Sequence, residues 1–549
     1  MLVCEGLARD GALVEGFAYE DGTVTYRGTA PVDASVRLSL QLPPTDDPQW
    51  LVPGVFYGEN RPESCTRIFP RFTRHVDLER MDSDAWSFRA DRCATPAVFA
   101  RGGGLITREL SPVGQAGVGF AYREGVPTIW LDFPYREEPL AYDGSETARP
   151  PDVKTHRWSP GDAVRFDVTQ TDGNWREHLR ARDDLSQAAW VSVEEAAELA
   201  AYGLHRWHYK ADPGRLIETR SFDGREERDH MHVSWVSGAP YAYALRRHGE
   251  RVGNEEYVAA ADAVLDHVER GLAPAGIFWP QWTHDRGWTW GWHPDHDRAH
   301  SRTLADAALF LLRAGREDAA RSNVAVALRA QRSDGALPAA LHVQTGEAVS
   351  WDGTAGMSWI PAFVAAGELD AARRAGEYYK RFDTWYGAPE DVDLSPSSED
   401  GYAAVMAFAA LEDWETARRA ADWTLTFRYS YDVDFAKGTT LGDYDFKSLG
   451  ADQASPANQH LHNFGLVCLP EFVALGEPYR TSVLQQLECF RQFIARYDGD
   501  FGARRGMAAE RYLQTDCFGP KGTLQPLSHS WCIGVLLLAC EEVIASSGA

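Results

Sequence analysis

The sequence predicts a two-part protein, an antiparallel β-sandwich followed by an (α/α)6 barrel, in which six outer helices surround a ring of six inner ones. Residues 1–186 contain short runs of alternating apolar and polar residues, separated by Gly, Pro and Asp. Residues 187–549 contain twelve segments with the helical period. These segments alternate between apolar all round and amphipathic, which predicts inner and outer helices in turn.

Alternating runs predict the strands of the first part. The clearest are Ser35–Leu42 and Ala163–Gln170, and residues 104–110, 118–122 and 128–133 have a similar character. Turn residues such as Pro160-Gly161-Asp162 separate these runs. Many short strands without a long helical stretch are typical of an antiparallel sandwich.

The second part opens at Ser192-Val-Glu-Glu195, which resembles a helix capping box. The predicted helices are 192–209, 239–249, 254–270, 302–314, 316–332, 356–367, 368–382, 402–412, 413–428, 460–475, 478–496 and 529–545. The even-numbered helices, such as 529–545, are apolar on every side and require complete burial, whereas the odd-numbered ones can cover them. A double ring satisfies both requirements.

The connections from outer to inner helices are long, and those from inner to outer helices are short. We number the long connections loop one to loop six in chain order. Each runs from an odd-numbered helix of the list above to the next even-numbered one, so loop one joins the first two helices and loop six the last two. In a toroid all six open at the same end, so a functional site is expected there, on loops held by a rigid scaffold.

Composition excludes several classes of function. The chain has 549 residues and a formal net charge of −25, which repels phosphate backbones and anionic membranes. We therefore expect no nucleic-acid or membrane partner, and homo-oligomerisation stays open. The longest apolar run, Cys532–Cys540, falls well short of the roughly 18 residues of a membrane span. The eight cysteines show no paired spacing, and no signal peptide is visible, so a cytoplasmic protein is expected.

The six loops combine aromatic side chains with carboxylates, a combination that suits a sugar. Sugar rings stack on aromatic faces through their C–H groups, and their hydroxyls need hydrogen-bond acceptors and donors. The expected partner is therefore a carbohydrate substrate. The candidate substrate-binding residues are Trp288, Trp290, Trp292, His293, Asp295, His296, Trp351, Asp400, His462 and, from the first part, Tyr57. The segment around Tyr57 would reach over the barrel mouth and close a pocket, or would instead support the domain interface.

No cofactor and no metal site is predicted. The histidines and aspartates of residues 293–300 include a spacing that binds metal on a helix, but Pro294 places them in a loop. The aspartates of loop five could bind calcium through oxygen ligands, although no twelve-residue calcium loop is present.

Two short motifs sharpen the prediction. Trp351-Asp352-Gly353 resembles the Trp-Asp-Ser-Gly stretch of the six-hairpin glycosidases, a superfamily that includes glucoamylase-like, trehalase-like and glucosidase-I-like enzymes. Glu510-Arg-Tyr512, followed by Leu527-Ser-His-Ser-Trp531, resembles their Glu-x-Tyr end. This resemblance implies an exo-acting, inverting glycoside hydrolase with Asp352 as general acid and Glu510 as general base. Glu399, in Pro396-Ser-Ser-Glu-Asp-Gly401, is the next catalytic candidate.

Two alternatives stay open. A polysaccharide lyase or sugar epimerase on the same toroid would use a Tyr or His base, and His230, His462 and His529 could supply it. The order of the two parts argues against both of these enzymes. A binding or scaffolding protein without enzymatic activity would not need so many carboxylates.

Overall fold

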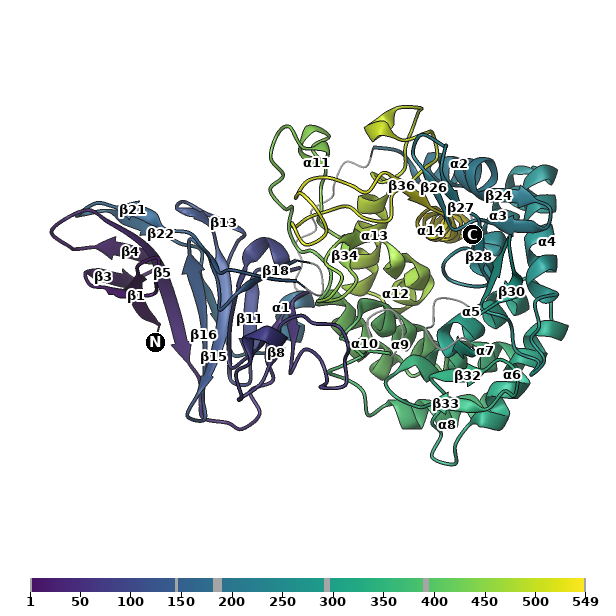
Figure 1. The fold of residues 1–549 in the computed structure, drawn as a ribbon, viewed down its shortest axis with the longest axis horizontal. Coiled ribbons are helices and arrows are strands. Elements are labelled where there is room, and N and C mark those ends of the chain that lie inside the picture. Colours follow the sequence, from purple (N-terminus) through teal and green to yellow (C-terminus); the bar gives the residue numbers. More distant parts are fainter. Residues whose placement is uncertain (1, 144–146, 181–189, 291–296, 389–393, 548–549) are drawn as a thin grey trace.

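The computed structural model describes residues 2–143, 147–180, 190–290, 297–388 and 394–547. A β part and a helical part lie side by side, and the N-terminus lies at the end of the β part that is far from the helices (Figure 1). The last strand of the β part ends at Thr171 and helix α2 begins at Val193. The boundary predicted at residue 186 lies outside the described residues.

Two antiparallel sheets form most of the β part. The larger has the strand order β10 (Ala85–Arg89), β15 (Gly117–Arg123), β16 (Val126–Phe133), β5 (Val32–Gln41), β1 (Val3–Leu7) and β2 (Leu13–Val14), with β21 (His156–Trp158) also paired to β5. The smaller has the order β23 (Thr169–Thr171), β12 (Gly103–Ile106), β11 (Ala97–Ala100), β6 (Leu51–Val52) and β7 (Phe56–Tyr57). The predicted strands at 35–42, 118–122 and 128–133 are thus confirmed as β5, β15 and β16.

The two sheets share one hydrophobic core. Strands β11 and β12 contact β15 and β16 of the other sheet. Between the sheets, the Trp50 and Phe120 rings stack with 4.4 Å between their centroids, and both side chains are buried. Aromatic pairs of this kind add to the burial that holds the layers together.

The helical part is a closed double ring. The inner helices are α3 (Ala239–Val252), α5 (Ser301–Arg313), α7 (Trp359–Ala366), α9 (Ser398–Ala410), α12 (Leu469–Leu475) and α14 (Ser530–Ser547). Each inner helix contacts the next, and α14 returns to contact α3. The outer helices are α2 (Val193–Gly203), α4 (Glu255–Glu269), α6 (Asp318–Ala330), α8 (Leu369–Tyr379), α10 (Trp414–Leu425) and α13 (Tyr479–Phe490). The predicted alternation of inner and outer helices is therefore confirmed.

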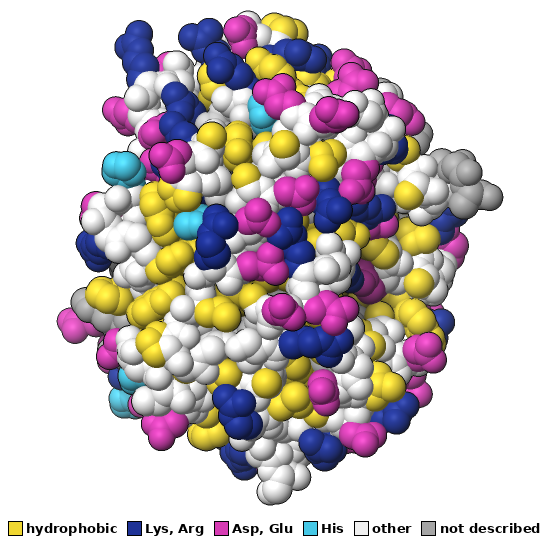
Figure 2. Space-filling model, turned by 90° about the vertical axis from the view of Figure 1, so that its right-hand side faces the viewer, with side chains coloured by type: hydrophobic (Ala, Val, Ile, Leu, Met, Phe, Trp, Pro, Cys, Tyr) yellow, Lys and Arg dark blue, Asp and Glu magenta, His cyan; other side chains and the backbone are white. Residues whose placement is uncertain are grey.

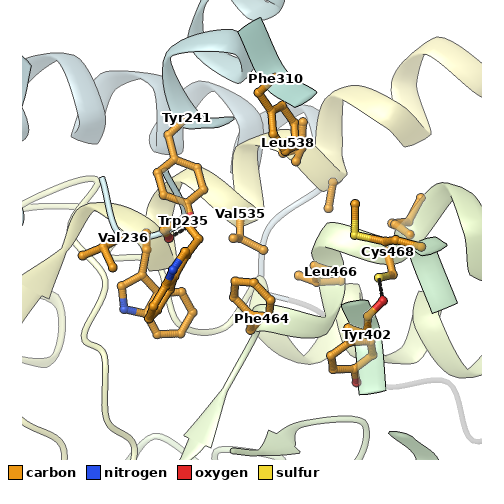
Figure 3. Close-up of a cluster of buried hydrophobic side chains, with 14 of the residues drawn as sticks. Trp235, Val236, Tyr241, Phe310, Tyr402, Phe464, Leu466, Cys468, Val535 and Leu538 are labelled. Carbon is orange, nitrogen blue, oxygen red and sulfur yellow. Dashed lines mark hydrogen bonds between the residues drawn. The ribbon is translucent and has the colours of Figure 1, made fainter. Parts of the chain in front are cut away.

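The closure of the ring depends on a close approach between α14 and α3. A Cβ atom placed on Gly534 of α14 would lie 2.2 Å from Cγ of Tyr241 on α3, so only glycine fits there. The Tyr241 hydroxyl donates a hydrogen bond to the carbonyl of Trp235 in loop one. Figure 3 shows this contact beside Val535 and Phe464. The ring closure thereby fixes the end of a loop at the barrel mouth.

Some helix bounds differ from the prediction for local reasons. The predicted helix 460–475 begins as a 3-10 helix at Phe464–Cys468, and α12 starts only at Leu469, where Pro470 occupies the first turn. Helix α9 starts four residues before the predicted Tyr402, because the Ser397 hydroxyl accepts from the backbone N–H groups of Glu399 and Asp400. This cap brings Glu399 into the first turn of an inner helix.

Acidic and basic side chains are interspersed over the barrel face that Figure 2 shows. Many are paired; Arg316, for example, bonds Asp262 at 3.0 Å and Glu269 at 2.7 Å. Within the described ranges, no helix is both long enough and apolar enough to cross a membrane.

The two parts are joined by buried polar contacts. Lys521 of loop six lies 3.1 Å from Asp91 and 3.2 Å from Glu109, both in the β part. Glu109 also accepts the backbone N–H of Asp434 in loop five. Burial raises the pKa of Glu109 to about 7, against the opposing effect of Lys521.

The raised pKa of Glu109 predicts how stability changes with pH. The unfolded carboxyl releases its proton near pH 4.5, whereas the folded one holds it to about pH 7. The folded state therefore binds more protons between these values, and stability falls as pH rises through this window. We expect Glu109→Gln to remove about 1–3 kcal/mol of that fall. Melting temperatures of both proteins at pH 5, 6, 7 and 8 check this, and parallel curves would contradict it.

Candidate active site

A cavity of about 470 Å³ lies at the mouth of the barrel, where loops one, four, five and six meet. A volume of this size is typical of small-molecule sites. Its lining comprises Glu218, Thr219, Arg228, Trp235 and Val236 of loop one, Glu399 of α9, Ala454, Asn458, His460, His462 and Phe464 of loop five, Glu510, Arg511, Phe518, Gln525, Leu527, His529 and Trp531 at and after loop six, and Arg67 of the β part.

Glu218 and Glu510 both approach the same ring nitrogen of His529. The Nε2 atom of His529 is 3.9 Å from Glu218 Oε1 and 3.8 Å from Glu510 Oε2. Strand pairing produces this arrangement, because β36 (Leu527–His529) pairs with β26 (Thr219–Ser221), and Thr219 lies opposite His529. The imidazole of His529 therefore lies beside two carboxylates, one from the first and one from the last long loop in the sequence.

Each of these two glutamates also has an arginine partner. Arg228 donates to Glu218 Oε1 at 2.8 Å, and Arg511 Nε lies 3.7 Å from Glu510 Oε2. Glu218 is only 2% exposed, and its Oε2 atom has no hydrogen-bond partner among the described residues. A buried acceptor without a partner is costly unless a ligand or water satisfies it.

Glu399 is held by an arginine from another inner helix, α5, which lies on the far side of α7 from α9 in the ring. Arg302, in the first turn of α5, donates to Glu399 Oε2. The Arg302 guanidinium lies between two aromatic rings, 4.2 Å from the Trp235 centroid and 4.4 Å from that of Phe464. Stacking and ion pairing together fix Glu399 at the cavity wall.

His462 presents a hydrogen-bond donor to the cavity. Its Nδ1 atom accepts the backbone N–H of Phe464 at 3.1 Å, which places the proton of the neutral ring on Nε2. Nε2 is buried without a hydrogen-bond partner in the described part of the chain. Burial lowers the pKa of His462, and of the adjacent His460, so both rings stay neutral at neutral pH.

Aromatic side chains form part of the wall. Figure 3 shows the Trp235 and Phe464 side chains near each other, below Tyr241, Phe310 and Leu538 in this view, and their rings meet edge to face. Trp531 contacts Phe464, and it also contacts His462 and His529, with ring centroids 6.1 and 6.5 Å apart. The cavity therefore joins apolar faces to acceptors and donors.

The structure brings together four of the residues predicted from the sequence, Glu510, Glu399, His462 and His529. Asp352 does not join them. Loop three folds into a hairpin of β32 (Ala340–His342) and β33 (Ala348–Ser350), and Asp352 follows it with an exposed side chain that accepts from Ser350 Oγ at 3.2 Å. Asp352 thus lies outside this cavity.

The other predicted residues are also elsewhere or undescribed. Trp351 is half-buried with Arg332 5.7 Å from its ring, and Asp400 is buried in α9 away from the lining. Trp288 packs on His267 of the outer helix α4, with centroids 4.6 Å apart, and Trp290 is half-buried outside the lining. Trp292, His293, Asp295 and His296 lie outside the described residues.

Tyr57 does not line the cavity, and the segment around it takes the second of the two places expected for it, at the interface. Tyr57 is 4% exposed, its hydroxyl bonds Thr426 Oγ1 at 2.9 Å, and its ring stacks on Phe427 at 4.7 Å. It fills the interface between the two parts, because an aromatic ring gains more there from burial than at an open rim. The residue that the β part contributes to the cavity is Arg67.

Sequence reasoning gave no special role to Arg67, Arg302, Phe464 or Phe518. Arg302 and Phe464 lie near the starts of two predicted inner helices, which are the ends that face the barrel mouth. That position was the sequence signal that could have marked both as site residues. Glu218 and Trp235 belong to loop one, and only the pairing of β26 with β36 brings Glu218 to His529.

No group of three or more metal-binding side chains is arranged around a common point in the described ranges. Three aspartates of loop five use their carboxylates on partners within the chain. Asp452 pairs with Arg428, Asp445 with Lys447, and Asp432 accepts the N–H of Leu449.

Comparison with known proteins gives similarity to solved structures alone. No protein-family model and no curated protein matches the sequence. A D-mannose isomerase is 14% identical, with 66% of this chain and 100% of that chain covered and a TM-score of 0.46. A sugar epimerase from a ruminal bacterium is 12% identical, with 64% and 98% covered and a TM-score of 0.43. The GH76 alpha-mannanase of Bacteroides thetaiotaomicron is 11% identical, with 65% and 97% covered and a TM-score of 0.43.

Proposed function

We propose that the cavity is the active site of a glycoside hydrolase in which Glu510 and Glu399 form the acid–base pair. The observation that carries this proposal is the convergence of three glutamates and an aromatic wall in one cavity of about 470 Å³. Glycoside hydrolysis needs two carboxyl groups on opposite sides of the scissile bond. Glu399 and Glu510 come from different loops and have separate cationic partners.

Glu510 is proposed as the general base that removes a proton from the attacking water. The motif that contains Glu510 implies the same role, and His529 and Arg511 lie beside its Oε2 atom. Glu399 is proposed as the general acid. Arg302 holds its Oε2 atom, which leaves Oε1 to donate a proton to the leaving oxygen. Glu218 and the Nε2–H of His462 are placed to bind sugar hydroxyls.

These roles predict different responses to leaving-group quality. A general acid matters little when the leaving group departs readily as an anion, whereas the water must always be activated. We therefore expect Glu399→Gln to lower kcat about 10³-fold on an alkyl glycoside but much less on a nitrophenyl glycoside. Glu510→Gln should be impaired on both. The reverse pattern would exchange the two roles.

A second candidate, a sugar epimerase or lyase, is favoured by the two histidines in contact with Trp531. His529 Nδ1 and His462 Nε2 are both buried without hydrogen-bond partners in the described residues. Two such nitrogens could remove and return a proton at a sugar carbon. Incorporation of solvent deuterium into recovered sugar, or an ultraviolet-absorbing unsaturated product, would establish this chemistry. Release of a reducing sugar without either would establish hydrolysis.

We also propose exo action. Arg67 of the β part lines the cavity beside loop five, which supports a pocket closed at one end. A closed pocket accepts only a chain end, so a polymer should yield mono- or disaccharide from the first minutes. Early mid-length products and a sharp fall in viscosity would contradict this.

A further inference from the structure

We propose that Arg67 binds a carboxylate on the sugar, so that the cavity selects a uronic acid unit over a neutral one. This inference rests on the proposed sugar-binding role of the cavity, and it adds the substrate class. Arg67 is the residue through which the β part reaches the site.

Arg67 differs from the other arginines at the cavity, each of which has a glutamate beside it. Arg228 is paired with Glu218, Arg302 with Glu399, and Arg511 with Glu510. These three glutamates are the only acidic residues among the described lining residues. No hydrogen bond or ion pair of the Arg67 guanidinium occurs within the described part of the chain. The Arg67 guanidinium is therefore available to a negatively charged group of a ligand.

The segment that carries Arg67 is anchored at both ends. Arg61 is 3% exposed, and its guanidinium donates to the Phe69 carbonyl at 3.0 Å and to Asp82 at 2.8 Å. Cys65 and Phe69 form a small buried cluster with Ala457 of loop five. These contacts hold the Arg67 backbone against the cavity rim, so binding need not order a free loop.

The chemistry of the guanidinium matches a carboxylate. Its planar fork donates two parallel hydrogen bonds to the two oxygens, a geometry that an ammonium group does not offer. The whole chain carries a net charge of −25, which repels anions in general. An anionic sugar would therefore need a local cation that no acid neutralises, and Arg67 supplies it.

The test compares two sugars that differ at one carbon. Calorimetric titration of the full chain with D-glucuronate and D-glucose measures binding without requiring turnover. We expect glucuronate to bind the wild type at least about tenfold more tightly than glucose, as a charge-assisted hydrogen bond allows. Arg67→Gln should abolish the preference by weakening glucuronate binding, and Arg67→Lys should restore it in part. The preference should also shrink as salt is raised.

Arg74→Gln is the matched control, because Arg74 lies in the same part with its side chain 55% exposed and outside the cavity. Equal binding of the two sugars, binding of neither, or an unchanged preference in Arg67→Gln would overturn the proposal. Tighter binding of glucose 6-sulfate than of glucuronate would assign the site to a sulfated sugar and overturn the uronate class. Selective glucuronate binding by a protein that hydrolyses no glycoside would support this inference and refute the proposed hydrolase.

Discussion

Glu510→Gln is expected to lower kcat about 10³-fold or more while the fold survives. Loss of a general base typically costs about 10²–10⁴ in rate, because water must then attack without transferring its proton. The amide of Gln keeps the size of the side chain and its acceptor oxygen toward Arg511, so packing around Trp531 should persist. Steady-state rates on the substrate found by the assays above, together with the melting temperature, measure both effects.

Asp352→Asn is the control for this experiment. The Asp352 side chain is exposed at the barrel rim and outside the cavity, so its turnover should stay within about twofold of the wild type. Near wild-type turnover in Glu510→Gln would remove Glu510 from the mechanism. A loss of activity confined to Asp352→Asn would restore the assignment that its motif implies.

The barrel could be predicted from the sequence because the distribution of apolar residues around each helix shows how much of that helix must be buried. Helix α14 is apolar almost all round from Ser530 to Cys540 and must be buried there, whereas α4 carries charges on one face and can cover such a helix. The helix ends were harder to place. The Ser397 cap that extends α9 to Ser398, and the 3-10 turn before α12, are local hydrogen-bond choices that periodicity does not report.

The site was predictable only in part, because it depends on contacts distant in sequence. Glu510 and His462 lie in loops that were expected at the mouth. Arg67 reaches the cavity from more than a hundred residues before the first barrel helix, and only the packing of Phe69 against loop five puts it there. The Trp351-Asp352-Gly353 motif misled for the opposite reason. The motif consists of three consecutive residues, whereas the position of the Asp352 side chain depends on how the β32–β33 hairpin folds before it.

A buried ion pair stabilises loop five and the position of His462 in the cavity. Asp452 and Arg428 are both fully buried, with Arg428 Nε donating to Asp452 Oδ1 at 3.0 Å. Arg428 also donates to the Tyr402 hydroxyl of α9 at 2.7 Å and to Gln486 of α13 at 2.8 Å. Asp452 pairs in β34–β35 with His462 of the cavity. The network therefore links an inner helix, an outer helix and a site residue.

Arg428→Met is expected to destabilise the protein by about 3–5 kcal/mol, because it leaves the Asp452 carboxylate buried without its cation. The midpoint of denaturant unfolding, followed by tryptophan fluorescence, measures this loss. The matched control is Arg480→Met on α13, the helix that also carries Gln486. The Arg480 side chain is 57% exposed, and its ion pair with Glu477 is long at 3.9 Å. That variant should lose less than about 1 kcal/mol. Equal losses in the two variants would show that the buried network does not anchor loop five.

At temperatures where Arg428→Met remains folded, His462 should be less firmly placed, so substrate binding should weaken more than in Arg480→Met.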